Sequence, residues 1–579
     1  MSTALLEREG ATALTRERRR LVAFGLAAFA GIATLFSLIH RYAADYALAV
    51  DIMKGAIAAV SALCLLYEAR RARQHQPIAE RWKRRAAIGL SVAALTAYFN
   101  GLRIDYPFYH RWEHYHYYLG AKYFPEMGYD NLYKCTVIAQ DEIGSVTYTD
   151  ERTGQRTTLD MSAEVRRPGR KIRNIGVDNL LMDVGGVLDH PESCKASFSP
   201  ERWMAFKADV QFFRTASEQG YWEDMERDHG YNPPPVWTIM GRALAELHPA
   251  TTSYLRLLAC VDIAYLLGVF AALYWAFGWR VCAVAAIFWG CQSPAPFFWT
   301  GGAFLRHDWL FFLVLSTCLA RKRRFKLAGA SMVYAGLLRI FPGLTVIGWL
   351  TLTGLHLLRH KRMARSHMQA LIGGVLAAAV LIPVSLAVAG KDSYQGFLEH
   401  TLTVHDRTPV TNHMGLRVLV AHKFGTGVES GRMKYTKDTT LVDPFEVWKR
   451  MRSERYAKYR YLGYAVIAAS FALFARVCGR VRSLWVCGCL GQIFIILLSQ
   501  ITCYYYTFMI LSAPLTRWRR QLELPLLGLA VLSQGIWRWT SWNDDRYTVL
   551  TVIMLAFCYF LLYTFAKKAR QPIRSCVRS

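Results

Sequence analysis

Long runs of apolar residues recur along most of this chain, separated by short polar stretches. A helix needs about 20 mostly apolar residues to cross the hydrocarbon core of a bilayer, with a range of roughly 17–25. The runs that meet or approach this length are residues 21–38, 47–67, 86–102, 255–277, 281–299, 370–389, 461–474, 484–498 and 549–565. A soluble protein with so many nearly uncharged runs would lack the amphipathic helices needed to cover them. The pattern therefore predicts an all-α polytopic membrane protein.

Basic residues gather between these runs, at positions 16–20, 70–85, 321–326, 359–365, 476–482, 517–520 and 567–578. Lysine and arginine concentrate in the cytoplasmic loops of membrane proteins. If every basic cluster is cytoplasmic, the chain makes about 14 spans with both termini inside. Two short spans must then lie between residues 326 and 359, with an outer turn near Arg339 and Pro342, because proline ends the preceding helix.

The same path divides the chain into five parts. These are N-terminal spans (1–102), a large outer loop (103–250), central spans (251–389), a second outer loop (390–457), and C-terminal spans with a basic cytoplasmic tail (458–579). In the large outer loop, residues 146–158 alternate on both sides of a turn carrying Gly154, which predicts a β-hairpin. Residues 203–214 and 221–226 are amphipathic and aromatic, as in helices at a membrane surface. We therefore expect a partly structured insertion on the outer face.

Charge and composition support this interpretation. The chain has 579 residues, of which 53% are hydrophobic, and a formal net charge of +28. Such a charge often indicates a nucleic-acid partner, but here the basic residues lie in short loops between apolar runs, so we expect membrane lipids and no nucleic acid as partners. The first run is longer than the roughly 7–15-residue core of a signal peptide and lacks a small-x-small cleavage site, which predicts an uncleaved first span.

Most of the 13 cysteines fall in predicted spans or inner loops, where they act as small apolar residues. Cys135 and Cys194 both lie in the large outer loop. An oxidising outer compartment would allow a disulfide between them, and two free thiols are the alternative. No Cys-x-x-Cys pair has partners at zinc-finger spacing, so we expect no structural metal.

Two carboxylates directly after the third predicted span are the first candidates for chemistry. Asp105 and Glu113 lie among tyrosine, tryptophan and histidine residues. Eight residues on a helix make a little over two turns, so both could face one side. A carboxylate in a partly dry site can accept a proton from a hydroxyl group. The alternative is an interfacial aromatic belt with incidental charges.

The surrounding motif resembles a known family. The stretch EHYHYYLGAKYF, from Glu113 to Phe124, with GYDNLY at 128–133, is similar to the first outer loop of GT-C-type glycosyltransferases. It looks most like glycosyltransferase family 87, the polyprenyl-phosphate-mannose-dependent mannosyltransferases. Weaker similarities follow in the same order: YNPPP at 231–235, the segment 328–342 ending GLLRIFP, and CYYYTFMILSAP at 503–514. Most of 144–228 and the second outer loop have no counterpart.

The resemblance implies a GT-C-like fold and an inverting glycosyltransferase. Such an enzyme would move a sugar, mannose or another hexose or pentose, from a polyprenyl-phosphate donor to a glycan, lipid or protein acceptor. It would act at the outer face of the cytoplasmic membrane. The acidic motif residue would be the general base. The family usually has aspartate where this chain has Glu113, so Asp105 is the second candidate.

The leaving phosphate of such a donor requires a cation. Arg339 stands in the place of the family's lysine, and Arg306 lies in another predicted outer turn. Guanidinium groups pair with phosphate oxygens through two hydrogen bonds. The alternatives are a snorkelling interfacial arginine for Arg339 and a solvated loop or local ion pair for Arg306.

Further candidates for substrate binding are polar or aromatic residues of the same stretches and outer turns: His116, Tyr117, Lys122, Asn232, His307, His405, His413 and Tyr505. A solvated loop or an aromatic belt is the alternative for each. A monophosphate donor requires no cofactor, although Glu113 and Asp105 could together hold a divalent metal. Two other classes stay open. A lipid-linked oligosaccharide polymerase or ligase would depend on outer arginine and histidine. A lipid-linked sugar transporter or flippase would carry charges deep in several spans and internal repeats.

Overall fold

The computed structural model describes residues 3–102, 108–151, 153–176, 179–404, 410–423 and 446–567. The chain is mostly helical, with 75% of residues in helices and 4% in strands. In the described part, seven helical segments are long and apolar enough to cross a membrane: Arg19–Tyr42, Tyr46–Arg73, Thr252–Phe277, Ile340–His360, Arg365–Ala389, Val447–Val481 and Asn543–Ala566. The predicted helical fold of membrane type is confirmed at this level. The count of about 14 spans and the GT-C-like arrangement stay predictions.

The chain forms two units. Unit 1 contains Met1–Asp105, Phe270–Trp299 and Tyr504–Ser541, and unit 2 contains Tyr106–Val269, Thr300–Cys503 and Trp542–Ser579. Each unit thus combines segments from distant parts of the sequence.

Unit 1 is a group of packed helices. Its main members are α1 (Thr3–Tyr42), α2 (Tyr46–Arg73), α3 (Glu80–Tyr98), α15 (Trp279–Cys291) and α30 (Glu523–Trp539). Smaller elements are η1 (Asn100–Leu102), α16 (Phe297–Thr300), η4 (Cys503–Leu511), α29 (Ser512–Leu515) and η5 (Arg520–Leu522). The Asp45 carboxylate accepts a hydrogen bond from Leu48 N (2.9 Å) and so caps α2. A Cβ atom on Gly290 would lie 2.6 Å from the Ala94 carbonyl oxygen, so glycine allows α15 to approach α3 closely.

Unit 2 contains a second group of helices. They are α14 (Thr252–Phe277), most of which belongs here, α17 (Asp308–Arg321), α18 (Phe325–Leu338), α19 (Ile340–Gly343), α20 (Val346–His360), α21 (Arg365–Ala389), α26 (Glu446–Val481), α27 (Leu484–Leu490), α28 (Ile493–Leu498) and α31 (Asn543–Ala566). A Cβ atom on Gly329 would fall 1.8 Å from the Ala370 carbonyl oxygen, and one on Gly373 would fall 1.8 Å from that of Lys326. Glycine therefore brings α18 and α21 into backbone contact, as small residues do between membrane helices.

The predicted helix break near Arg339 and Pro342 is confirmed, whereas the two short spans and the outer position of the turn stay predictions. Helix α18 ends at Leu338, Arg339 is extended (φ −151°, ψ 138°), and the short helix α19 follows with Pro342 inside it. The proline lacks an N–H group and so disfavours continuation of the preceding helix. The break brings the Arg339 side chain into the interior of unit 2, where it is 7% exposed.

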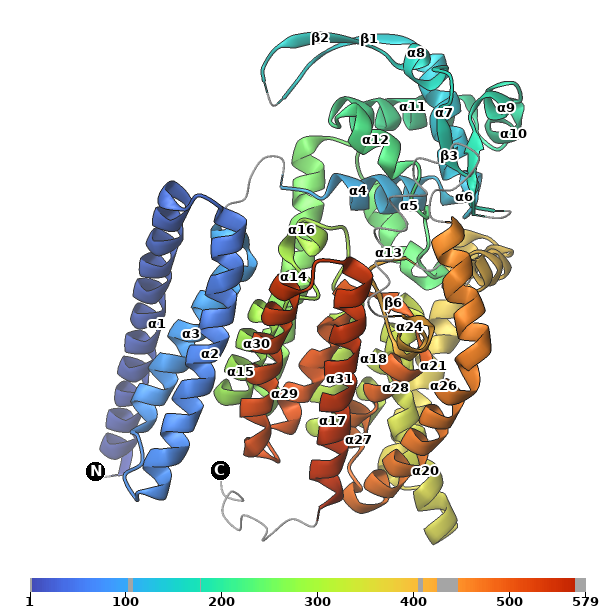
Figure 1. The fold of residues 1–579 in the computed structure, drawn as a ribbon. Helices are drawn as coiled ribbons and strands as arrows, with labels where there is room; N and C mark the ends of the chain where they lie inside the picture. The colour runs from blue at the N-terminus through green and yellow to red at the C-terminus, as the bar shows by residue number, and fades with distance from the viewer. Residues whose placement is uncertain are drawn as a thin grey trace. The chain divides into compact units, whose positions relative to one another are not determined.

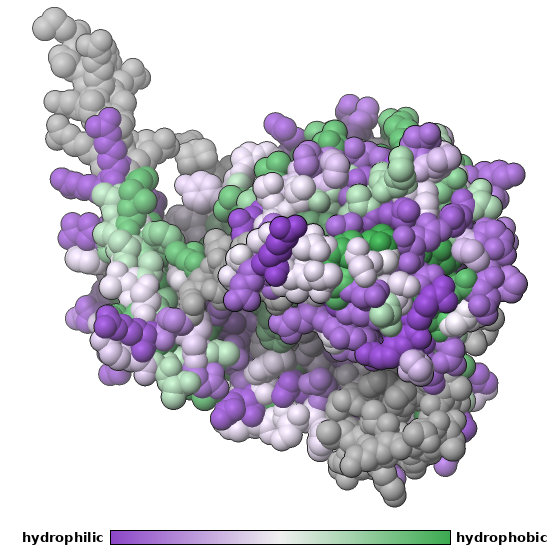
Figure 2. Space-filling view, turned by 90° about the horizontal axis from the view of Figure 1, so that it is seen from above, coloured by the Kyte–Doolittle hydropathy of each residue, from purple (hydrophilic) through white to green (hydrophobic). Residues whose placement is uncertain are grey.

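A cap layer, defined here as the described residues between 108 and 250, covers one end of the unit 2 helices (Figure 1). Its helical elements are α4 (Arg111–His114), η2 (Tyr115–Leu119), α5 (Gly120–Lys122), α6 (Phe124–Met127), α7 (Leu132–Ile143), α8 (Met161–Val165), α9 (Gly185–Leu188), α10 (Glu192–Lys195), α11 (Pro200–Thr215), α12 (Gln219–Met225) and α13 (Pro235–Ala245). Viewed from this side, hydrophilic side chains cover much of its surface (Figure 2).

The predicted hairpin of the cap layer is confirmed. Strands β1 (Ser145–Thr149) and β2 (Arg156–Asp160) pair antiparallel, with Thr147 opposite Thr158, and Gly154 in the turn has φ +70°. A second small sheet pairs β3 (Lys171–Arg173) with β4 (Leu181–Asp183). Cys135 on α7 and Cys194 on α10 form a disulfide. Of the four aromatic residues of α11, Trp203, Phe206 and Phe213 are buried and Phe212 is half-buried, so they do not form an exposed membrane-facing stripe.

Residues 390–457, the predicted second outer loop, also contribute described elements to unit 2. They are α22 (Ser393–Phe397), η3 (Leu398–Val404), β5 (His413–Met414) and α24 (Leu416–Ala421). Strand β5 pairs with β6 (Ile501–Thr502).

Candidate functional site

Glu113 lies on α4, at the start of the cap layer. The helix is one turn long, and the His110 ring nitrogen Nδ1 accepts a hydrogen bond from Glu113 N (3.3 Å) at its beginning. The chain continues into η2, a π-helical turn, which is a feature found often at functional sites. The Glu113 residue is 8% exposed. A carboxylate this buried requires a partner.

That partner is Arg306, whose guanidinium forms an ion pair with the Glu113 carboxylate. Arg306 is 3% exposed and precedes α17. The two segments are also joined through their backbones, because His110 N donates a hydrogen bond to Gly302 O (2.8 Å). Gly302 has φ +68°, and a Cβ atom there would approach Tyr109 Cα to 3.0 Å. Glycine at this position therefore allows the Arg306 turn to approach the Glu113 segment closely.

Arg339 belongs to the same cluster. Its Cζ atom lies 5.4 Å from the ring centre of Trp237 and 5.8 Å from that of Tyr117. The Arg306 Cζ atom lies 6.0 Å from the same Tyr117 ring. One aromatic ring thus lies beside both guanidinium groups, which is a favourable arrangement for cations in a dry site.

Asn232 is the fifth predicted residue that lies in this cluster. The Tyr117 hydroxyl donates a hydrogen bond to Asn232 Oδ1 (3.0 Å), which fixes the ring from the YNPPP segment. Glu113, Tyr117, Asn232, Arg306 and Arg339 therefore form one cluster from four separate segments of the sequence. It combines one carboxylate, two guanidinium groups and an aromatic ring.

His307, next to Arg306, is held by a residue that the sequence analysis did not select. His307 N donates to Asp262 Oδ1 (2.7 Å), and His307 Nδ1 lies 2.7 Å from Asp262 Oδ2. Asp262 lies within the apolar helix α14 and is 4% exposed. An acid inside an apolar run usually marks a functional site, so the sequence did contain a signal for Asp262. Trp237, the other residue not selected, carries no such signal.

Two of the predicted substrate ligands have partners inside the cap layer instead. The Lys122 ammonium forms an ion pair with Asp209 (2.8 Å), and both are buried. The His116 ring contacts Trp112 O and the Tyr133 hydroxyl, each at 2.7 Å. These contacts connect parts of the layer to one another, and we leave both residues out of the candidate site.

The other predicted residues lie elsewhere. His413 is on β5, and its Nδ1 atom accepts a hydrogen bond from Val410 N (3.4 Å). Tyr505 belongs to unit 1, where its ring centre lies 4.8 Å from that of Tyr504. Asp105 and His405 lie outside the described residues.

Among the described residues, no group of three His, Cys, Asp or Glu side chains comes together in a way that could hold a metal ion. Because Asp105 is not among them, its pairing with Glu113 around a metal stays open. Comparison of the chain with protein-family models, characterised proteins and solved structures found no match. The relation to glycosyltransferases therefore stays a prediction from the motifs.

Proposed function

We propose that the protein is an inverting glycosyltransferase that takes a sugar from a polyprenyl-phosphate donor and acts at the outer face of the cytoplasmic membrane. The observation that carries the proposal is the buried Glu113–Arg306 pair with Tyr117 and Arg339 beside it. Three of these residues, Glu113, Tyr117 and Arg339, come from the motifs that resemble the family. The cluster brings these distant motifs into contact, as a common site requires.

In the proposed reaction, Glu113 accepts a proton from the acceptor hydroxyl while that oxygen attacks the anomeric carbon. The bond between the anomeric carbon and the phosphate oxygen breaks, and prenyl phosphate leaves with the electron pair. A single displacement by one nucleophile inverts the anomeric configuration. Arg339 and Arg306 stabilise the charge that develops on the leaving phosphate.

Arg306 has a second role in this scheme. Before the donor binds, its guanidinium pairs with Glu113 and keeps the buried carboxylate in place. A donor phosphate would compete for the same guanidinium and weaken its hold on Glu113. Donor binding and availability of the base would therefore be linked through one arginine.

The membrane location supports a lipid-linked donor. Seven described helices are long and apolar enough to span a bilayer, and the cap layer presents many hydrophilic side chains (Figure 2). A prenyl chain can stay among such helices while its phosphate and sugar lie at the surface.

The test is a transfer assay with the purified full-length protein in lipid nanodiscs. Radiolabelled polyprenyl-phosphate mannose is the first donor and polyprenyl-phosphate arabinose the second, with a lipid extract and a synthetic alkyl mannoside as acceptors. We expect label in the acceptor with the wild type and none above background with Glu113→Gln. Glu126→Gln is the matched control, because Glu126 also pairs with an arginine of the cap layer, Arg202 (2.7 Å). Absence of transfer from both donors to all acceptors would contradict the proposal.

A lipid-linked oligosaccharide polymerase or ligase is the second candidate, and the His307–Asp262 contact favours it. A histidine oriented by a buried carboxylate is a common general base. In that case His307→Gln would abolish activity on a pyrophosphate-linked oligosaccharide, and Glu113→Gln would retain it. The same two variants therefore separate the candidates.

A further inference from the structure

A pocket in unit 1 lies apart from the candidate site. It has a volume of about 340 Å³ and is lined by α2, α3, α15 and α30. Aliphatic and aromatic side chains form most of its wall, among them Ile78, Ala87, Leu90 and Val284. The Ser61 hydroxyl, one of its few polar groups, already donates to Ile57 O (2.7 Å). The interior of the pocket therefore suits a hydrocarbon chain.

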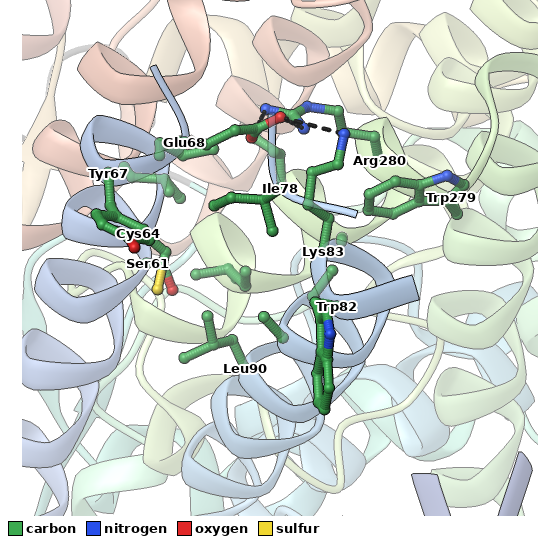
Figure 3. A pocket seen from close by; sticks show the side chains of 17 residues that line it. Ser61, Cys64, Tyr67, Glu68, Ile78, Trp82, Lys83, Leu90, Trp279 and Arg280 are labelled. Atoms are coloured by element: carbon green, nitrogen blue, oxygen red, sulfur yellow. Dashed lines mark hydrogen bonds and ion pairs between the residues drawn. The ribbon is translucent and has the colours of Figure 1, made fainter. Parts of the chain in front are cut away.

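One end of the pocket is ionic (Figure 3). Arg280 pairs with Glu68 (2.8 Å) and with Glu523 (2.6 Å), and Lys83 pairs with Glu80 (2.5 Å) and lies 3.5 Å from Glu68. Three acids, Glu68, Glu80 and Glu523, thus lie beside these two basic groups. The turn between α2 and α3 adds further positive charge, because the segment from Glu68 to Arg85 contains two acids, Glu68 and Glu80, and seven basic residues: Arg70, Arg71, Arg73, Arg81, Lys83, Arg84 and Arg85. The turn next to this end of the pocket therefore carries an excess of positive charge.

The pocket is also open to the surroundings of the helices. Tyr67 and Trp82 line it and are 57% and 53% exposed. Both belong to helices with apolar, exposed side chains, such as Leu63 at 62%. Tyrosine and tryptophan are enriched where hydrocarbon meets headgroups. Lipid could therefore enter the pocket from the bilayer.

We propose that this pocket binds one acyl chain of an anionic glycerophospholipid, with the lipid phosphate beside Lys83 and the basic turn between α2 and α3. The apolar wall holds the chain, and the excess of basic residues selects a negative headgroup, as juxtamembrane basic clusters do. The charge complementarity favours a lipid over an apolar protein segment. The proposal does not depend on the proposed transferase activity.

The experiment uses the full-length protein in phosphatidylcholine nanodiscs that contain phosphatidylglycerol with a photoactivatable diazirine in one acyl chain. After illumination, mass spectrometry maps the labelled peptides. We expect label on the peptides of α2, α3 and α15 that line the pocket. Leu90→Trp fills the pocket and should reduce this label several-fold. Leu63→Trp is the matched control, because Leu63 is exposed on α2 and is not part of the lining. Equal labelling of Leu90→Trp and the wild type would overturn the proposal.

A second arm tests the headgroup. The same diazirine chain on phosphatidylcholine should label the wild type less than phosphatidylglycerol does, and Lys83→Gln should reduce that preference. Equal labelling by the two lipids in the wild type would overturn the anionic assignment. Stronger competition by unlabelled polyprenyl phosphate than by unlabelled phosphatidylglycerol would also overturn it.

A third measurement covers the case in which Leu90→Trp does not fold. Cys64 lines the pocket, and it and Cys260 are the exposed free cysteines of the described chain. In a background with Cys260→Ser and with Cys576→Ser, a position outside the described residues, phosphatidylglycerol should slow the reaction of Cys64 with a maleimide several-fold relative to phosphatidylcholine alone. An unchanged rate would contradict occupancy of the pocket.

Discussion

Two buried ion pairs of unit 2, Glu113–Arg306 and Lys122–Asp209, begin on the same short stretch of sequence but have different surroundings. The Asp209 carboxylate accepts hydrogen bonds from Lys122 (2.8 Å), from the Tyr123 hydroxyl (2.8 Å) and from Ala250 N (2.7 Å). Lys122 also donates to His248 O (3.3 Å). This pair is thus enclosed by donors and acceptors from several segments. Such a network fixes α11 against the end of the cap layer.

Aromatic rings lie beside both pairs, since Lys122 Nζ is 5.2 Å from the ring centre of Tyr118 and Arg306 Cζ is 6.0 Å from that of Tyr117. The Glu113–Arg306 pair differs because a second guanidinium, that of Arg339, lies beside the same Tyr117 ring. An arginine against aromatic rings keeps its charge and its planar set of donors, which match phosphate oxygens. Burial and charge alone therefore do not identify a site. What distinguishes the two pairs is the set of hydrogen-bond donors around Asp209 in one and the second guanidinium near Arg306 in the other.

The largest expected effect on folding comes from breaking the Lys122–Asp209 pair. Asp209→Asn leaves the Lys122 charge buried without its counter-ion, which should lower the free energy of unfolding by about 3–5 kcal/mol. Transferase activity should fall only in proportion to the folded fraction. Thermal unfolding in detergent, with transfer measured below the transition, checks both parts. Abolished activity in fully folded Asp209→Asn would move this pair into the site.

The disulfide of the cap layer should have the next largest effect. Cys135 and Cys194 are separated by 59 residues, and cross-links over loops of this size typically stabilise by about 2–4 kcal/mol. Cys135→Ser with Cys194→Ser should lower the unfolding temperature and leave the activity of the folded protein intact. Cys64→Ser is the control, since that thiol is free. An unfolding temperature equal to that of the wild type would contradict a stabilising cross-link.

A smaller change, in donor affinity, is expected when Arg339 is replaced by lysine, which keeps the positive charge. Arg339→Lys loses the planar contact with Tyr117 and Trp237 and the two-point binding of phosphate, so donor affinity should fall about tenfold, or about 1.4 kcal/mol. Initial rates at varied donor concentration measure this as a higher KM. Arg242→Lys is the control, because Arg242 pairs with Glu246 (3.4 Å) away from the candidate cluster. Equal KM values for Arg339→Lys and the wild type would remove Arg339 from donor binding.

The smallest effect concerns pH. Burial, together with the charge of nearby His110, lowers the pKa of His114 to about 3. The folded protein therefore keeps His114 neutral where the unfolded chain binds a proton. Above about pH 6.5 His114 is neutral in both states and does not lower the free energy of unfolding. As the pH decreases from there toward 3, the free energy of unfolding falls by about 1.4 kcal/mol per pH unit.

His114→Gln should remove this part of the pH dependence and can still donate to Leu255 O, which His114 Nε2 contacts at 3.2 Å. Unfolding temperatures measured between pH 7 and pH 4.5 check the slope. His190→Gln is the control, because His190 is exposed. Identical slopes for the wild type and His114→Gln would contradict the assignment.

Local patterns predicted the local features of the fold. Alternation around Gly154 predicted the hairpin. Pro342 predicted the helix break that places the Arg339 side chain in the candidate cluster. Length and apolarity predicted the spanning helices. These features depend on residues close together in the sequence, so one chain is enough to find them.

Local patterns could not predict which residues belong to the candidate site and which connect parts of the cap layer. His116 and Tyr117 are adjacent, yet one contacts Tyr133 and the other faces the candidate cluster. The π-helical turn η2 changes the angle between successive side chains, so helical spacing does not say which residue faces which side. The partners Arg306 and Asp209 come from far along the chain. Arg306 was predicted to bind phosphate from its place in an outer turn, but no local pattern indicated its pairing with Glu113, and none indicated Asp209.

The central claim is that Glu113 is the base of a sugar transfer. The most direct measurement is a single-turnover assay in which radiolabelled donor is bound to the protein before the acceptor is added. We predict that Glu113→Gln binds donor as well as the wild type does and transfers the sugar about 10²–10⁴-fold more slowly. A transfer rate equal to that of the wild type, in a folded variant with donor bound, would contradict the account.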